Sequence, residues 1–200
     1  MLSKKEAFCP TRLVRATALA AALNCLAAWA APLATGQVNE IGIGTGMGVP
    51  VYETAAVHGP GIYVLGYAGY RMGQALQLRG EVSFTELSAD RASWGRLRIG
   101  RVGATLAYSP FGTGNGVYAL AGAGMYALRN PQRGGDPGLV PGITLGVGAS
   151  GQLAGMTLFA EAREEVPFST YGTDTESAPT MYIPLAVGIR VPCCGRTPPR

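Results

Sequence analysis

Residues 75–84 read Ala-Leu-Gln-Leu-Arg-Gly-Glu-Val-Ser-Phe, and apolar and polar side chains alternate along this stretch. One face carries the apolar side chains, Leu76, Leu78, Val82 and Phe84. The other face carries Gln77, Arg79, Glu81 and Ser83. A period of two is typical of a β-strand that has one apolar and one polar face.

Residues 41–51 and 181–191 alternate in the same way, with glycine, other small residues, Tyr182 or Arg190 opposite the apolar side chains. A soluble sandwich buries its apolar face, whereas a membrane barrel turns that face toward lipid and its small or polar face toward the lumen. A tilted strand needs about 9–11 residues to cross a bilayer, against about 5–6 in the usual globular strand. The runs here are of the longer kind.

Residues 1–30 have the features of a secretory signal peptide. Basic residues from Lys4 to Arg15 precede an Ala/Leu-rich segment, and Ala28-Trp29-Ala30 offers small residues for cleavage. A membrane anchor is the alternative, but the segment is short and contains Thr17 and Asn24. We therefore expect a cleavable signal peptide over residues 1–30, one barrel domain over 31–191 and a C-terminal tail over 192–200.

Composition excludes several classes of function. The leader holds four of the 16 basic and one of the 12 acidic residues, so the remainder carries 12 − 11 = +1, and we expect no nucleic-acid partner. Glycine is frequent, at 30 of 200 residues, and lies inside the predicted strands, where narrow barrels need small residues. Charged residues are only 14%, yet outside the leader no apolar run is long enough for a membrane-spanning helix. A membrane protein without such helices is a barrel.

Cysteine supplies no structural framework. Outside the leader only Cys193 and Cys194 remain, and a disulfide between chain neighbours, with Cα atoms about 3.8 Å apart, would be strained. No further metal ligands surround them in the tail, so we expect neither a metal site nor a cofactor.

The pattern predicts an all-β chain of eight strands. These are Val38–Tyr52, Gly61–Met72, Gln74–Thr85, Trp94–Tyr108, Val117–Leu128, Leu139–Ser150, Met156–Glu165 and Thr180–Val191. In the fourth strand the apolar face changes phase near Gly100, which predicts a β-bulge there. The longer or more polar connections alternate with short glycine-rich ones, as extracellular loops and periplasmic turns do. Aromatic residues near the strand ends would form girdles: Tyr52, Tyr63, Phe84, Trp94, Tyr108, Phe111, Tyr118, Tyr126, Phe168 and Tyr182.

In this order of elements the chain resembles the small eight-stranded outer-membrane barrels of the OmpX and OmpA-transmembrane-domain type. The resemblance covers about residues 38–191 and rests on Leu78-Arg79-Gly80-Glu81, the Leu-Phe-Ala-Glu-Ala-Arg run at 158–163 and the last strand at 184–191. The family's last strand usually ends on an aromatic residue that the assembly machinery reads, and here Val191 holds that place.

The resemblance implies an eight-stranded antiparallel up-and-down transmembrane β-barrel in the outer membrane of a Gram-negative cell envelope. It implies a porin-like but non-enzymatic protein, with a structural role or surface contacts made by its loops. An eight-stranded barrel fills its interior with side chains, so the lumen is too narrow for general diffusion. The expected partners are outer-membrane lipid, the assembly machinery and a surface partner of the loops.

Two other classes of protein fit parts of the pattern. A secreted or periplasmic lipocalin-like barrel would hold a small apolar ligand and would place Leu76 and Phe84 inside, with Arg79 and Glu81 in water. A lipid A-modifying enzyme would need a catalytic histidine beside a serine. The chain's single histidine, His58, stands in a predicted loop as His-Gly-Pro-Gly, so we interpret it as a solvated loop residue.

Charged residues on two predicted strands mirror each other. Counting from the strand starts, Arg79 stands level with Glu161 and Glu81 level with Arg163. The third and seventh strands lie opposite each other in an eight-stranded barrel, and unpaired charges in a poorly hydrated lumen are costly. We therefore expect a structural charge network of these four residues inside the lumen, joined by Arg98 and Arg190.

Overall fold

The computed structural model describes residues 38–90, 95–112, 115–129, 138–154, 156–168, 170–171 and 178–193. The expected signal peptide, Trp94 and Cys194 lie outside these ranges.

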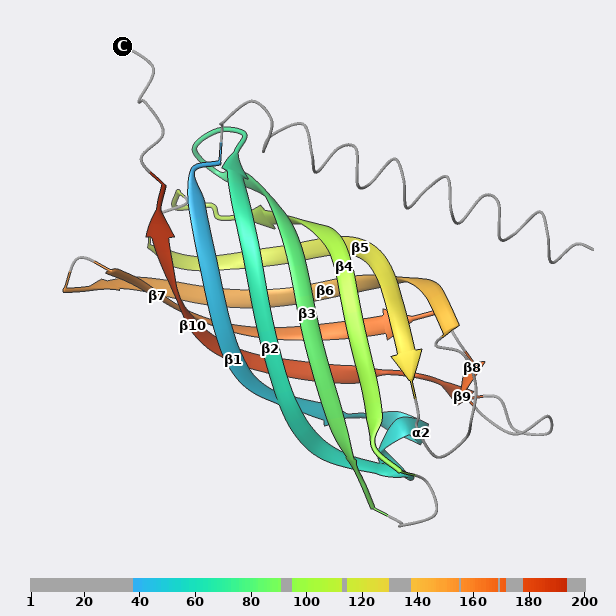
Figure 1. The fold of residues 1–200 in the computed structure, drawn as a ribbon. Coiled ribbons are helices and arrows are strands. Elements are labelled where there is room, and N and C mark those ends of the chain that lie inside the picture. The colour runs from blue at the N-terminus through green and yellow to red at the C-terminus, as the bar shows by residue number, and fades with distance from the viewer. Residues whose placement is uncertain are drawn as a thin grey trace, which may run out of the picture.

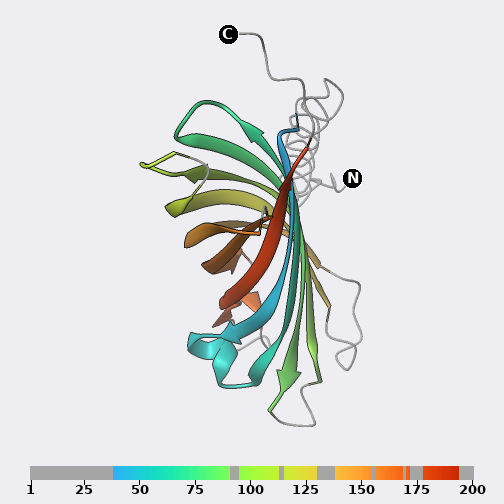
Figure 2. The same cartoon turned by 90° about the vertical axis from the view of Figure 1, so that its left-hand side faces the viewer.

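Eight long strands of the described chain close into one antiparallel barrel (Figures 1 and 2). They are β1 (Glu40–Pro50), β2 (His58–Arg71), β3 (Leu76–Ala89), β4 (Leu97–Tyr108), β5 (Gly116–Arg129), β6 (Gly138–Leu153), β7 (Met156–Pro167) and β10 (Tyr182–Pro192). Each strand pairs with its neighbours along this series, and β1 closes the barrel against β10. The predicted eight-stranded up-and-down architecture is thereby confirmed.

The two ends of the barrel differ. At one end lie the β1–β2 connection with the short helix α2 (Tyr52–Ala55) and the two-residue strands β8 (Thr170–Tyr171) and β9 (Ala178–Pro179) (Figure 1). We call this the loop end, because the two longest connections, β5–β6 and β7–β10, also lie there. The other, the turn end, holds the β2–β3, β4–β5 and β6–β7 connections together with the start of β1. No helix in the described part of the chain is long and apolar enough to cross a membrane.

The alternation in residues 75–84 places apolar side chains outside the barrel and polar ones inside. Leu76, Val82 and Phe84 are 36%, 49% and 43% exposed on the outer face. Arg79 and Glu81, on the inner face, are 1% and 0% exposed. The barrel wall is therefore the reverse of a soluble domain, and the arrangement required by a lipocalin-like barrel is contradicted.

The predicted bulge at Gly100 is wrong. Strand β4 pairs with β3 in unbroken register from Tyr108 to Leu97, and Gly100 lies opposite Phe84 within that register. The apparent change of phase arises because Leu97 and Ile99 face inward, where polar side chains were expected. Among the described strands, β2 carries a register shift between Gly59 and Gly61, at Pro60, which has no N–H to donate to the ladder.

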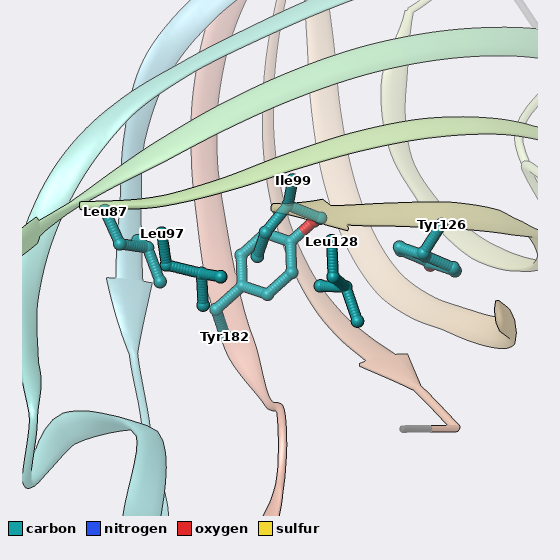
Figure 3. Close-up of a cluster of buried hydrophobic side chains, with 6 residues drawn as sticks. All are labelled: Leu87, Leu97, Ile99, Tyr126, Leu128 and Tyr182. Carbon is teal, nitrogen blue, oxygen red and sulfur yellow. The ribbon is translucent and has the colours of Figure 1, made fainter. Parts of the chain in front are cut away.

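The inward-facing Leu97 and Ile99 belong to an apolar layer that fills the lumen toward the loop end. The layer consists of Leu87, Leu97, Ile99, Tyr126, Leu128 and Tyr182, and their side chains gather inside the barrel (Figure 3). The lumen therefore has an apolar layer as well as a polar one. A pattern that assigns every apolar residue to the outer face misreads this layer.

Inward-facing glycines make room for large lumenal side chains. A Cβ added to Gly42 would lie 2.2 Å from the ring of Tyr67, and one added to Gly148 would lie 2.4 Å from the ring of Tyr118. Both distances are far below ordinary contact. Glycine weakens a strand, but at these positions the missing side chain leaves the space into which the tyrosine rings pack.

The aromatic residues divide into two groups, so the expected girdle is only partly right. Tyr52, Phe84, Tyr108, Phe111 and Phe168 are exposed. Four others are buried in the lumen: Tyr63, Tyr118, Tyr126 and Tyr182. The hydroxyl groups of Tyr118, Tyr126 and Tyr182 hydrogen-bond to Glu161, Thr144 and Glu165, so these three rings place a polar group inside the lumen.

Candidate functional site

Six charged side chains from β3, β4 and β7 meet in the middle of the lumen. This lumenal charge cluster consists of Arg79, Glu81, Arg101, Glu161, Arg163 and Glu165. Every member is at most 4% exposed. Three arginines and three glutamates give 3 − 3 = 0, so the buried cluster is neutral. Neutrality matters because an unpaired charge in a poorly hydrated interior is very costly.

Arg79 of β3 bonds directly to Glu161 of β7, on the opposite wall. Arg79 Nη1 donates to Glu161 Oε1 at 2.6 Å, and the hydroxyl of Tyr118 donates to the same oxygen at 2.7 Å. The guanidinium carbon of Arg79 lies 4.5 Å from the ring centroid of Tyr67 and 5.0 Å from that of Tyr118. The arginine is thus held by an ion pair and by two aromatic faces.

Arg163 of β7 bonds to the carboxylates of both Glu81 and Glu161. Its Nη1 donates to Glu81 Oε2 at 2.7 Å, and its Nη2 donates to Glu81 Oε1 at 3.0 Å. Nε of the same guanidinium donates to Glu161 Oε2 at 2.9 Å, and Nη2 also bonds this oxygen. The bidentate bond to Glu81 crosses the lumen, so β3 and β7 are joined by two crossing arginine–glutamate pairs.

Arg101 of β4 and Glu165 of β7 are members of the cluster that the sequence interpretation did not name, and Arg101 contacts two carboxylates. Its Nη1 donates to Glu81 Oε2 at 2.8 Å, the oxygen to which Thr105 Oγ1 donates at 2.7 Å. Its Nε lies 4.0 Å from Glu165 Oε2, which accepts the hydroxyl of Tyr182 at 2.7 Å. The available signal was the polar face that Arg101 shares with Gly103 and Thr105, opposite the outward apolar residues of β4.

Arg98, expected inside the lumen, lies on the outer face. Its side chain is 46% exposed, and its Nε donates to Glu86 Oε2 at 2.7 Å. Arg96 Nη1 donates to the other oxygen of Glu86 at 2.8 Å. The expectation failed because it required the bulge at Gly100, and without the bulge Arg98 faces away from its neighbours Leu97 and Ile99.

Arg190 of β10 does face the lumen, but nearer the turn end. Its Nη1 lies 3.6 Å from Glu40 Oε1, and its Nη2 donates to Ser150 Oγ at 2.7 Å. The hydroxyl of Tyr67 donates to the same Glu40 oxygen at 3.2 Å, and the ring of Tyr67 contacts Arg79. Arg190 is therefore linked to the lumenal charge cluster through Glu40 and Tyr67.

The side chains of the charge cluster and of the apolar layer fill the described part of the lumen between them. Beside Arg79, toward the turn end, a space of about 10 Å³ remains. This is at the lower limit for a single water molecule. Toward the loop end the apolar layer follows directly, and Tyr182 belongs to that layer while its hydroxyl bonds Glu165. Among the described residues, the charged side chains connect opposite walls of the barrel.

The barrel resembles two barrels of known structure. Neisserial surface protein A is 21% identical, with a TM-score of 0.49 over 76% of this chain and 95% of that chain. The N-terminal β-barrel domain of Pseudomonas aeruginosa OprF is 15% identical, with a TM-score of 0.48 over 77% of this chain and 98% of that chain. No family model matches the chain, and no curated protein matches it.

His58 is placed differently from the sequence interpretation. It begins strand β2 and is 1% exposed, so it is a buried residue of the loop end rather than a solvated loop residue.

Within the described ranges, histidine, cysteine and acidic side chains do not form groups of three or more that could hold a metal ion. The backbone N–H of Cys193 donates to the carbonyl of Asn39 at 2.8 Å, which ties the end of the barrel sheet to its beginning.

Proposed function

We propose that this protein is a non-enzymatic barrel of the outer membrane, exported by the signal peptide over residues 1–30 and inserted by the outer-membrane assembly machinery. The observation that carries the proposal is the reversed wall. Ionised groups are sealed inside, and apolar side chains stand in contact with the surroundings. Water is a poor solvent for such an outer face, whereas the hydrocarbon of a bilayer is a good one.

The outer apolar surface continues around the barrel. Each strand exposes large apolar side chains, among them Ile43, Ile62, Val82, Val102, Val117, Leu145, Leu158 and Val187. An exposed apolar surface of this extent is unusual for a monomeric soluble protein and marks contact with a membrane or partner. The barrel strands run from 11 to 16 residues, long enough to cross a bilayer when tilted.

The proposed role is structural, or one of surface contact through the loops, rather than transport. The lumenal charge cluster joins opposite walls by buried ion pairs, and the apolar layer closes the remaining space. With the loop end toward the cell exterior, the long connections become extracellular and the short turns periplasmic. A surface partner would then meet the loops and not the lumen.

Two arrangements of the described residues speak against the rival functions. A soluble ligand-binding barrel needs an apolar cavity, and here the centre of the lumen is filled by paired charges. A lipid-modifying hydrolase needs a base beside a nucleophile in reach of substrate, and the single histidine, His58, is buried.

Membrane fractionation tests the proposal. We expect the full chain, expressed with its leader in a Gram-negative host, to sediment with outer membranes and to stay there after a carbonate wash. N-terminal sequencing of the sedimented protein should show that the leader is removed. Release into the soluble fraction by carbonate would refute the membrane assignment.

A further inference from the structure

The outer face carries a group of arginines at the loop end of β3, β4 and β5. We call Arg96, Arg98 and Arg129 the rim arginine patch. Arg96 and Arg98 are 68% and 46% exposed, and Arg129 is exposed at the end of β5. All lie outside the lumen, at the level where the apolar outer wall ends.

The patch has an excess of positive charge. Glu86 accepts a hydrogen bond from Arg96 and another from Arg98, which leaves 3 − 1 = +2 on these four residues. Arg129 is the direct cross-strand partner of Arg98, and both face outward. No carboxylate among the described residues forms an ion pair with Arg129.

Such an arrangement calls for an anion. Like charges directly opposite each other on one face of a sheet are destabilising, so the Arg98–Arg129 pair costs stability in isolation. A phosphate group between them would reverse that effect, because guanidinium groups bind phosphate oxygens through paired charged hydrogen bonds. Glu86 meanwhile fixes the direction of Arg96 and Arg98.

The outer surface of the barrel next to the patch is apolar, and its central residues have small side chains. The next outward row toward the turn end runs Phe84, Gly100, Ala127 and Leu139 across β3 to β6. A Cβ placed on Gly100 would meet nothing within 4 Å. The small residues Gly100 and Ala127 thus lie between the large exposed side chains of Phe84 and Leu139.

We propose that the rim arginine patch binds the phosphate of a phosphorylated glycolipid in the outer leaflet, with one of its acyl chains lying over Gly100 and Ala127. The proposal rests on the proposed function, since only a membrane barrel with its loop end outward brings these residues to the headgroup level. A lipid is favoured over a soluble anion because the charged patch and the apolar row from Phe84 to Leu139 are adjacent on the same face.

Native mass spectrometry of the folded full chain in detergent tests the proposal, with diphosphorylated lipid A as the probe. We expect Arg129→Gln and Arg98→Gln each to weaken lipid binding about fivefold, the size of one good exposed charge contact. Arg71→Gln is the matched control, because Arg71 is also exposed but lies at the turn end. It should bind like the wild type.

Two further comparisons separate the lipid from other anions. Removing both phosphates from the probe should abolish the difference between wild type and Arg129→Gln. Gly100→Leu, which fills open space and should leave the fold intact, should weaken lipid binding severalfold. A water-soluble glucosamine phosphate that bound as tightly as the lipid, unaffected by Gly100→Leu, would assign the patch to a soluble anion and overturn the proposal.

Failure of this inference differs from failure of the membrane assignment. Equal lipid binding by wild type, Arg98→Gln and Arg129→Gln, with all three resistant to carbonate extraction, would overturn the lipid site and leave the outer-membrane barrel intact. Carbonate release of the wild type would overturn both.

Discussion

Arg79 and Glu161 stand on β3 and β7, four places apart around the eight-stranded barrel, yet their side chains meet at 2.6 Å inside it. Strands so placed share no backbone hydrogen bond. The pair therefore joins opposite walls directly, and Arg163 with Glu81 does so a second time. If backbone hydrogen bonds between neighbouring strands alone held the barrel, β3 and β7 would be connected only through the strands that lie between them.

The first prediction concerns this pair. Glu161→Ala should destabilise the folded barrel by about 3–5 kcal/mol, because it leaves Arg79 buried without its carboxylate. Adding Arg79→Ala to Glu161→Ala should cost little more, since the second change removes the stranded charge. Urea unfolding in detergent, followed by tryptophan or tyrosine fluorescence, measures both effects.

The matched control for this experiment is Glu164→Ala. Glu164 is an outward-facing, half-buried residue of the same strand. Its loss should change stability by about 0–1 kcal/mol. Small and additive effects of Glu161→Ala and Arg79→Ala would contradict a structural role for the cross-barrel pair.

The second prediction compares Arg98, which the sequence interpretation placed in the lumen, with Arg101, which it did not name. Arg101→Ala should destabilise the barrel by about 3 kcal/mol or more, because Glu81 and Glu165 both face this guanidinium inside the lumen. Arg98→Ala should cost about 0–1 kcal/mol, because Arg98 pairs with Glu86 on an exposed face. Equal effects in the same unfolding assay would be incompatible with the inside and outside positions described here.

These two arginines also mark how far the sequence could be interpreted. Alternation in residues 75–84 predicted the inner and outer faces of β3 correctly, because that strand keeps one chemical character per face until Glu86 and Leu87. β4 does not, since its inward side changes from apolar Leu97 and Ile99 to Arg101 and Thr105. When the inward side of a strand changes from apolar to polar, its sequence pattern shifts by one residue, as it would at a β-bulge. Only the pairing with neighbouring strands shows which of these two causes applies.

The rim arginine patch was beyond prediction for a related reason. Arg98 and Arg129 become neighbours only through the β4–β5 register, and Glu86 joins them through the β3–β4 register. Registers between strands follow from packing of whole faces, which no single stretch of sequence contains.

The third prediction tests which face meets lipid. In a background with Cys193→Ser and Cys194→Ser, the outward variants Leu78→Cys and Val82→Cys should react with a lipid-soluble maleimide in reconstituted vesicles. The inward variants Gln77→Cys and Ser83→Cys should not, because their positions are buried in the lumen. Labelling is measured by mass spectrometry. The opposite pattern of labelling would reverse the assignment of faces.

The fourth prediction concerns the space that glycine provides. Gly148 faces the lumen, and a Cβ there would lie 2.4 Å from the ring of Tyr118, whose hydroxyl bonds Glu161. Gly148→Val should therefore displace Tyr118, weaken its hydrogen bond and destabilise the barrel by about 1–3 kcal/mol, the usual cost of overpacking. Near-ultraviolet circular dichroism should show the changed tyrosine environment, and urea unfolding should show the lost stability.

Gly151→Val serves as the control, because a Cβ at Gly151 meets nothing within 4 Å. If Gly148→Val unfolded at the same urea concentration as Gly151→Val, the ring of Tyr118 would not depend on the missing side chain at position 148.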